Sequence, residues 1–314
     1  MSRRIFLMAF PVAASLLLVS CGGPPSPRPD VRRVLCSTFP VHLIARNVVQ
    51  GREGLALDLM LPAQLGCPHD YALTPDDLRR LAQADALIVN GLGLEEFLGA
   101  PVRKANPSLA LIDSSAGIAD LLHEAHEGPV AHRAHEGPCA HGVNPHLFAS
   151  PRQAARMAVT IAEGLAKFDP AGAELYRRNA NAYAERLNRL ADELRELGNR
   201  LKNRRIATPH GVFDYLARDM GLEVVAHLQA HAGQEPSAAE MIGLVRILRD
   251  RQAGAVFTEP QYPPRTARTI AREAGIAAAT LDPVATGPQN ASLDYYEKIM
   301  RENRKTLESV LGTK

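Results

Sequence analysis

The stretch that decides the predicted fold is Cys67–Leu98, which reads CPHDYALTPDDLRRLAQADALIVNGLGLEEFL. It predicts a helix near Pro75–Ala84, a strand at Ala86–Asn90 and a short helix around Leu94–Leu98. The other strands expected in this half of the chain are Val34–Phe39, Leu55–Leu61 and Leu109–Ile112, with a helix after the first that runs through about Val49. Strands that alternate with helices indicate parallel βαβ units.

The second half of the chain repeats this alternation. Its predicted strands are Arg205–Thr208, Leu222–Ala226, Gly254–Thr258 and Ile276–Leu281. Its predicted helices run up to Met220, from the Ser237 cap through about Asp250, around Arg265–Ala274 and over Leu293–Leu311. We therefore expect two α/β domains, over 33–169 and 204–314. Ligands of parallel sheets gather at the carboxyl ends of the strands, and His69 follows the second predicted strand directly.

A long helical pattern joins the two halves, from about Pro170 to Leu201. Apolar residues repeat along it at spacings of four and three, namely Tyr176, Ala180, Tyr183, Leu187, Leu190, Leu194, Leu197 and Leu201. Some 30 residues span roughly 45 Å. A coiled-coil dimer is one interpretation of such a stripe. A single helix over 170–203 that lies along both halves explains it equally well, and would restrict domain closure to a small tilt.

The first twenty residues have the layout of a secretory signal, with Arg3 and Arg4 before an apolar run over Ile5–Val19. The run ends in Leu-Val-Ser-Cys at Cys21, which resembles a bacterial lipobox, so we expect Cys21 to carry a lipid anchor. A plain signal peptide with a chance cysteine is the alternative. Residues 21–32 are rich in Gly, Pro and Ser and suit a flexible tether between membrane and domain.

Composition adds further limits. A chain of 314 residues with 46% apolar residues suits two domains with real cores, and a net charge of +2 does not suggest nucleic acid. Without Cys21 the cysteines are Cys36, Cys67 and Cys139. This odd count argues against a full disulfide framework, while one bridge remains open.

A histidine-rich segment lies within Asp120–His146 and contains two copies of a repeat, AHEGPVAH at Ala125–His132 and AHEGPCAH at Ala134–His141. Two Gly-Pro steps and few apolar residues exclude a packed helix or strand. Short His-rich tracts are typical of metal binding. We therefore predict a loop over 120–142 with auxiliary metal ligands at His123, His126, His132, His135 and His141. A merely solvated loop is the alternative, and an expression tag would sit at a terminus.

Several short motifs resemble the metal-binding substrate-binding proteins of ABC transporters, of the zinc and manganese type. In the first half these are Pro68–Tyr71, Thr74-Pro75, Ala84-Asp85, Asn90-Gly91, Glu95 and the box Asn144–Phe148. In the second half they are Pro209-His210, Glu235–Ser237, Thr258–Gln261, Leu281–Pro283 and the set Tyr296, Met300 and Asn303. Cys67 and Asn144 depart from the family's usual residues. The resemblance covers most of 33–311 and implies two doubly wound (β/α)4-type domains joined by one long rigid helix, with a metal site in the cleft between them.

The resemblance carries the metal-ligand role to His69, His146, His210 and Asp282. Three imidazoles and one carboxylate form a tetrahedral set of the kind that Zn²⁺ takes. Glu259 is the reserve ligand, or else a residue that forms a hydrogen bond across the cleft. Among the other histidines, His42 is expected in the core or an interface, and His227 and His231 at a strand end and in a loop.

The resulting prediction is a lipid-anchored, extracytoplasmic zinc receptor that delivers Zn²⁺ to a membrane permease driven by a cytoplasmic ATPase, with the receptor acting as a monomer. Three nitrogen ligands favour Zn²⁺ over Mn²⁺. The alternatives are a manganese or iron receptor of the same family and a surface adhesin on the same fold. A hydrolase is not expected, because four ligands close the shell and no His-Glu-x-x-His helix is present.

Overall fold

The computed structural model describes residues 31–66, 68, 71–123, 142–229 and 235–313. It contains two four-stranded parallel sheets. The strands of the first are β1 Arg32–Cys36, β2 Leu55–Leu59, β3 Ala86–Val89 and β4 Ala110–Asp113. Those of the second are β5 Arg205–Thr208, β6 Glu223–His227, β7 Ala255–Thr258 and β8 Ala277–Thr280. The predicted α/β class and its two parallel sheets are confirmed.

The two sheets have the same strand order, β2-β1-β3-β4 and β6-β5-β7-β8. The first strand of each half is therefore central. Val34 of β1 pairs with Leu57 on one side and Ala86 on the other, and Ile206 of β5 pairs likewise with Val224 and Ala255. Because every pairing is parallel, the carboxyl ends of each sheet's strands lie along one edge.

In the N-terminal half (residues 31–169) the helices are α1 Phe39–Val49, α2 Pro75–Gln83, η1 Glu96–Leu98, α3 Gly99–Ala105, η3 Leu147–Ala149 and α4 Pro151–Phe168. Three of them, α3, η3 and α4, were not predicted. The first strand ends at Cys36 rather than Phe39, because the chain turns into α1 with Pro40 in the first helical turn. The helix expected over Leu94–Leu98 is a single 3₁₀ turn that leads directly into α3.

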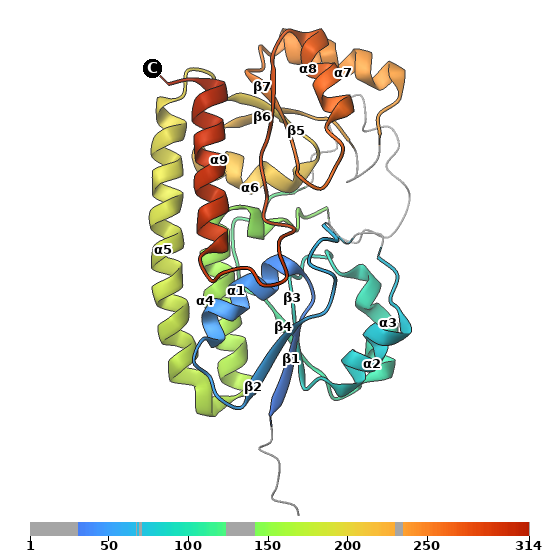
Figure 1. The fold of residues 1–314 in the computed structure, drawn as a ribbon, viewed down its shortest axis with the longest axis vertical. Helices are drawn as coiled ribbons and strands as arrows, with labels where there is room; N and C mark the ends of the chain where they lie inside the picture. The colour runs from blue at the N-terminus through green and yellow to red at the C-terminus, as the bar shows by residue number, and fades with distance from the viewer. Residues whose placement is uncertain (1–30, 67, 69–70, 124–141, 230–234, 314) are drawn as a thin grey trace, which may run out of the picture.

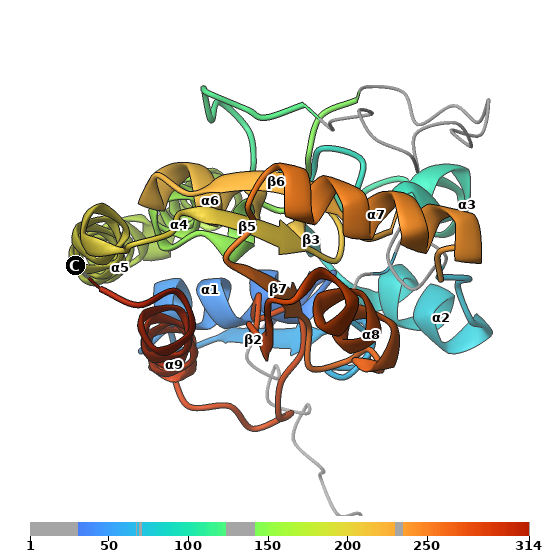
Figure 2. The same ribbon diagram turned by 90° about the horizontal axis from the view of Figure 1, so that it is seen from above.

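The long helix is confirmed as α5 Ala173–Arg200, preceded by the short turn η4 Pro170–Gly172. It runs along one side of the molecule past both sheets, beside α4 and α9 (Figures 1 and 2). All eight residues of its apolar stripe are buried within this chain. Packing against α1, α4, α6 and α9 therefore accounts for the stripe that a coiled-coil dimer would also have explained.

In the C-terminal half (residues 204–313) the helices are η5 Gly211–Phe213, α6 Asp214–Met220, α7 Ala238–Asp250, α8 Arg265–Ala274 and α9 Tyr295–Leu311. After β8 the chain crosses back to the N-terminal half before α9 begins (Figure 1). There Arg46 donates to the carbonyl of Ala291 at 2.6 Å and Asn47 donates to that of Leu293 at 3.0 Å. The two halves are thus connected twice, by α5 and by this returning segment.

The largest apolar cluster contains residues of both halves, together with the buried stripe of α5. Smaller clusters lie on the outer side of each sheet, around Leu81 in the first half and around Leu248 in the second. Cys36 is buried in the shared cluster as a free thiol. Within the described ranges, no helix is long and apolar enough to cross a membrane.

Candidate metal centre

Three predicted site residues of the C-terminal half follow neighbouring strands. His210 comes after β5, Glu259 directly after β7 and Asp282 after β8, and these strands are adjacent in the order β5-β7-β8. Their carboxyl ends lie at one edge of the sheet, so parallel pairing alone brings the three side chains toward the same region. His210 and Glu259 are buried, with 5% and 2% of their surface exposed.

The N-terminal half contributes His146, which precedes η3 and is 2% exposed. Its imidazole ring meets that of His210 edge to face, with 5.1 Å between ring centroids and 76° between ring planes. The loop that carries His146 is held by Asn90, which follows β3 and donates to the carbonyl of Pro145 at 2.9 Å. The structure therefore brings together one predicted ligand from each half.

His210 and Glu259 lie side by side, with 3.1 Å between Nδ1 and Oε1. The two atoms are close, yet their alignment does not make a hydrogen bond, and both ring nitrogens of His210 and Oε1 of Glu259 are buried without a hydrogen-bond partner among the described residues. A buried polar atom without a partner costs about 1–3 kcal/mol. Imidazole nitrogen and carboxylate oxygen are both zinc donors, so a divalent cation is the ligand that this cluster suits.

Asp282 is half-buried, and its backbone is clamped by Asn303 of α9. Asn303 accepts from the Asp282 N–H at 2.9 Å and donates to its carbonyl at 2.7 Å. Burial above all, together with the negative charges of Glu259 and Glu302, raises the pKa of Asp282 to about 6, although the hydrogen bond from the Val284 N–H favours the charged form.

Several predicted site residues lie outside the described residues. These are His69, Cys21 and the loop residues His126, His132, His135 and His141, and the cysteines Cys67 and Cys139 lie outside as well. Among the residues that are described, no group of three or more His, Cys, Asp or Glu side chains is gathered so that it could hold a metal ion. What the described part contributes is the pair His146 and His210 with Glu259 beside it. The four-residue ligand set therefore stays a prediction.

The remaining described histidines are His42, His227 and His123, of which His123 stays a predicted auxiliary metal ligand. His42 is half-buried on α1, and burial lowers its pKa to about 4. His227 ends β6 and lies 2.9 Å from Asp214, between Nε2 and Oδ1. His123 forms an isolated bridge with Val143, which makes these two residues the base of the His-rich segment.

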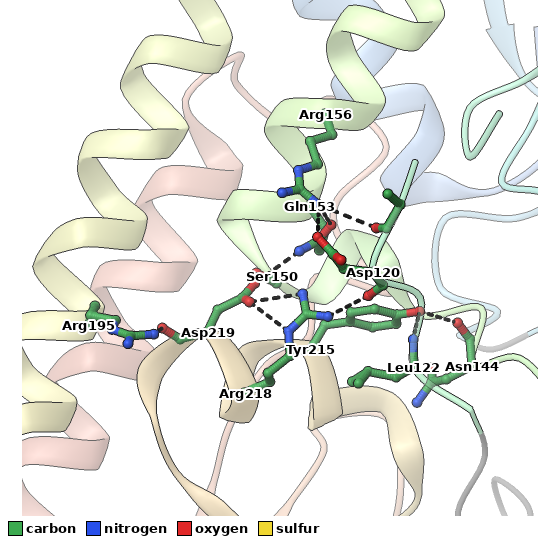
Figure 3. A network of polar contacts seen from close by, with 11 residues as sticks. Asp120, Leu122, Asn144, Ser150, Gln153, Arg156, Arg195, Tyr215, Arg218 and Asp219 are labelled. Atoms are coloured by element: carbon green, nitrogen blue, oxygen red, sulfur yellow. Dashed lines mark hydrogen bonds and ion pairs between the residues drawn. The ribbon is translucent and has the colours of Figure 1, made fainter. Parts of the chain in front are cut away.

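Beside the histidines lies a network of polar contacts between the two halves, which no local pattern indicated (Figure 3). From α6, Tyr215 bonds both sides of the base of the His-rich segment, since it accepts from the Leu122 N–H at 3.0 Å and donates to the Asn144 carbonyl at 2.9 Å. Asp219 accepts from the hydroxyl of Ser150 at 2.6 Å. The departure of residue 144 from the usual family residue was the one available sign of a special role here.

Comparison with known proteins places this geometry in a family. The sequence profile of the periplasmic zinc-uptake complex component A family, ZnuA, matches residues 34–310. The chain belongs to this family. Family members are substrate-binding components of transport systems that act outside the cytoplasm and work with an ABC permease and ATPase. The high-affinity zinc uptake protein ZnuA of Bacillus subtilis is 29% identical over 315 residues, which cover 97% of each chain.

Solved structures agree with the assignment. A crystal structure of ZnuA superposes with a TM-score of 0.74 at 27% identity, over 90% of this chain and 100% of that one. The substrate-binding protein FpvC of Pseudomonas aeruginosa in complex with Mn²⁺ superposes with a TM-score of 0.76 at 29% identity, over 89% of this chain and 98% of that one. The fold predicted from the motifs is thus confirmed as that of metal-binding receptors.

Proposed function

We propose that this chain is the zinc-capturing receptor of an ABC uptake system, which binds Zn²⁺ outside the cytoplasm and delivers it to the permease. The observation that carries the proposal is the buried pairing of His146 from one half with His210 from the other, 5.1 Å apart, in a zinc-uptake family member. Binding and release require no covalent chemistry, so the residues of the site act as ligands and positioning groups.

The ligands in this proposal are His69, His146, His210 and Asp282. Glu259 lies 3.1 Å from Nδ1 of His210, where a change in ring alignment is enough to form a hydrogen bond. In the role proposed for it, the carboxylate accepts the Nδ1–H in the metal-bound protein and directs Nε2 to the metal. Carboxylates commonly orient metal-bound histidines in this way. Glu259 is also the reserve ligand. Manganese is the alternative cargo, favoured by the likeness to Mn²⁺-bound FpvC and by the second carboxylate beside Asp282.

Competition titration of purified, chelator-stripped protein tests the function. Zinc is expected to bind tightly and to resist displacement by excess Mn²⁺, because imidazole ligands favour Zn²⁺ in the Irving–Williams order. His210→Ala should lower zinc affinity by about 100–1,000-fold, since it removes one of four ligands. His42→Ala is the control, because His42 lies on α1 outside the cluster. A wild-type protein that prefers Mn²⁺ at equal free metal would reverse the assignment.

The His-rich segment is proposed as a weaker, auxiliary site. From its Gly-Pro steps we expect metal binding there to carry a loss of chain entropy, which reduces affinity relative to a preformed site. Deletion of 123–141 should lower the zinc stoichiometry and leave the tightest site nearly unchanged. Loss of the tight site in the deletion variant would instead make the segment part of it.

The membrane anchor is proposed to be a lipid on Cys21. Cys21→Ser should then move the protein from the membrane fraction to the soluble extracytoplasmic fraction, because a serine at this position cannot accept the thioether-linked lipid. Membrane association that is unchanged in this variant would refute the lipid anchor without affecting the metal proposal.

A further inference from the structure

We infer that Asn144 is a positioning residue of the metal centre, whose side-chain amide selects the tautomer of His146 and ties His146 to the segment that carries His210. The inference rests on the proposed function in one respect, namely that these two histidines are zinc ligands. Asn144 is 1% exposed, and its side chain makes four polar contacts to neighbours of the site.

The orientation of the Asn144 amide follows from three of those contacts. Its Oδ1 lies 3.0 Å from the backbone N–H of His146, which can only donate. Its Nδ2 lies 2.7 Å from the carbonyl oxygen of Gly211 and 3.1 Å from a carboxylate oxygen of Asp214, which both accept. The opposite orientation would place a donor against a donor and an oxygen against two oxygens. The amide is therefore fixed with its oxygen toward His146.

The fourth contact then selects the tautomer. Nδ1 of His146 lies 2.9 Å from the same Oδ1. Because an amide oxygen only accepts, Nδ1 must carry the hydrogen, and the lone pair of the neutral ring is on Nε2. A histidine ligand coordinates through the nitrogen that has the lone pair, and the partner of the other nitrogen fixes the ring. Asn144 thus presents Nε2 of His146 as the coordinating atom before metal arrives.

The same side chain connects the two halves. Asn144 lies in the N-terminal half, whereas Gly211 and Asp214 belong to the C-terminal half, and Gly211 is the residue next to His210. The bond from Nδ2 to the Gly211 carbonyl therefore holds the His210 segment at a set position relative to His146. Tyr215 reinforces this, because its hydroxyl donates to the backbone carbonyl of Asn144 at 2.9 Å (Figure 3).

Gly211 is required for this approach. A Cβ atom at this position would lie 2.8 Å from Nδ2 of Asn144 and 3.1 Å from a carboxylate oxygen of Asp214. Gly211 is not among the residues with positive φ, so alanine fits the backbone there while it pushes the amide away. The absence of a side chain at residue 211 and the amide at residue 144 form one complementary arrangement.

An amide is needed here rather than a carboxylate, because a carboxylate cannot donate. Asn144→Asp would place a second oxygen against the Gly211 carbonyl and a negative charge 3.1 Å from Asp214. The exchange Asn144→Asp with Asp214→Asn restores one donor between the two side chains. In that double variant the amide oxygen introduced at position 214 would still accept from Nε2 of His227, as Oδ1 of Asp214 does at 2.9 Å in the native protein.

The test combines zinc affinity with a direct readout of the tautomer. Two-bond ¹H–¹⁵N correlation spectra of the metal-free protein at neutral pH should show His146 with its hydrogen on Nδ1, and Asn144→Ala should lose this single tautomer. In competition titration with a chromophoric chelator, Asn144→Ala should bind zinc about 10–100-fold more weakly. Gly211→Ala should also weaken zinc binding, by a smaller factor, although it removes no polar group.

The matched control is Ser150→Ala. It removes a different hydrogen bond between the halves, from the Ser150 hydroxyl to Asp219 at 2.6 Å (Figure 3). Its zinc affinity should stay within about twofold of the wild-type value. The tautomer of His146 should be unchanged. Asn144→Asp should bind zinc more weakly than the wild type, and the added Asp214→Asn change should recover part of that loss.

Three results would overturn the inference. They are a native His146 with its hydrogen on Nε2, zinc affinity in Asn144→Ala within about twofold of wild type, or an equal loss in Ser150→Ala, which would indicate general loosening of the interface. Failure of the proposed function is distinct. There, zinc would leave the resonances of His146 and His210 unshifted in the native protein, while the metal-free spectrum still decides the role of Asn144.

Discussion

The two halves share strand order and direction, yet they use equivalent carboxylates differently. Glu95 follows β3 in the N-terminal half and Glu259 follows β7 in the C-terminal half, and β3 and β7 occupy the same place in their sheets. Both carboxylate oxygens of Glu95 form hydrogen bonds within the N-terminal half. They accept from the Ser37 hydroxyl at 2.6 Å and from the Asn90 and Gly91 N–H groups at 2.7 and 3.1 Å. Oε1 of Glu259 instead faces His210.

This difference teaches that a repeated topology supplies places for polar groups but does not decide their use. In the first half the carboxylate stiffens the loop after β3, and Asn90 of that loop holds the segment before His146. In the second half Oε2 of Glu259 accepts from Nε2 of Gln261 at 2.5 Å, while Oε1 faces His210. The corresponding strands are thus followed by a carboxylate that supports a loop in one half and by a carboxylate that lies against a predicted metal ligand in the other.

The halves also differ from independent domains, because one apolar core runs through both of them around α5. Opening the cleft by a wide hinge would expose this core, and close-packed interiors do not deform continuously. Metal entry and release are therefore expected to use local movement on the cleft side, with the helical side unchanged.

The largest expected effect is on the connection between the halves. Tyr296 of α9 is fully buried, and its hydroxyl donates to the carbonyl of Phe148 in the N-terminal half at 2.7 Å. Tyr296→Ala should lower the free energy of unfolding by about 3–5 kcal/mol, because it leaves a cavity in the shared core. Tyr296→Phe keeps the ring and should cost about 1 kcal/mol. Urea denaturation measures both, and a cost below about 1 kcal/mol for the alanine variant would mean that the halves are held elsewhere.

The next effect is a pH dependence that belongs to Glu95. Burial raises its pKa to about 7 despite its hydrogen bonds, against an ordinary 4.5. Between these two pH values Glu95 is ionised in the unfolded chain and protonated in the folded one. The contribution of Glu95 to the free energy of unfolding is therefore complete below pH 4.5 and is lost as pH rises through about 7. Glu95→Gln should remove this pH-dependent change in the free energy of unfolding, which is on the order of 3 kcal/mol.

Denaturation of the metal-free wild type and Glu95→Gln proteins at pH 5 and pH 8 measures this change. The contributions of the other titrating groups are the same in both proteins and cancel in the comparison. Glu259→Gln is the matched change in the other half, and it should weaken zinc instead. Equal slopes in wild type and Glu95→Gln would show that Glu95 ionises as it does in the unfolded chain.

A smaller effect compares two helix caps of the same kind. α2 begins with a capping box of Thr74 and Asp77, and α7 with one of Ser237 and Glu240. The first is partly buried and strengthened by Tyr71, which donates to Asp77 at 2.8 Å, whereas the second is exposed. Thr74→Ala should therefore cost about 1–2 kcal/mol and Ser237→Ala about 0.5–1 kcal/mol in unfolding free energy. A larger cost for Ser237→Ala than for Thr74→Ala would show that burial and the Tyr71 bond do not strengthen the cap of α2.

The smallest effect is the change of overall size on zinc binding. Two halves joined by α5 and by the returning segment should keep a radius of gyration near ~19 Å, with a change of less than about 2% on metal binding. Small-angle scattering of metal-free and zinc-loaded protein measures it. Contraction well beyond that limit would indicate hinge closure and would contradict the shared core as a rigid connection.

Much of the fold was predictable because it is written in local periodicity. Runs such as Ala86–Val89, helical stripes such as that of α5 and the order of strands and helices are properties of neighbouring residues. The positions of His210, Glu259 and Asp282 followed in turn, since each comes after a strand and parallel strands end together. α4 was not predicted, although its buried residues, half of them alanine, follow a helical apolar period.

By itself the sequence determined the two α/β halves, the helix between them and which residues follow the ends of the strands. The spacing of residues along the chain encodes all of these. Only the tertiary structure decided that His146 meets His210, that Asn144 bonds across the halves and that Glu95 is buried while Glu259 faces a histidine. These outcomes depend on polar partners that are distant in sequence, such as Asn144 and Gly211. Their distances and orientations are set by the packing around α5, which no local spacing records.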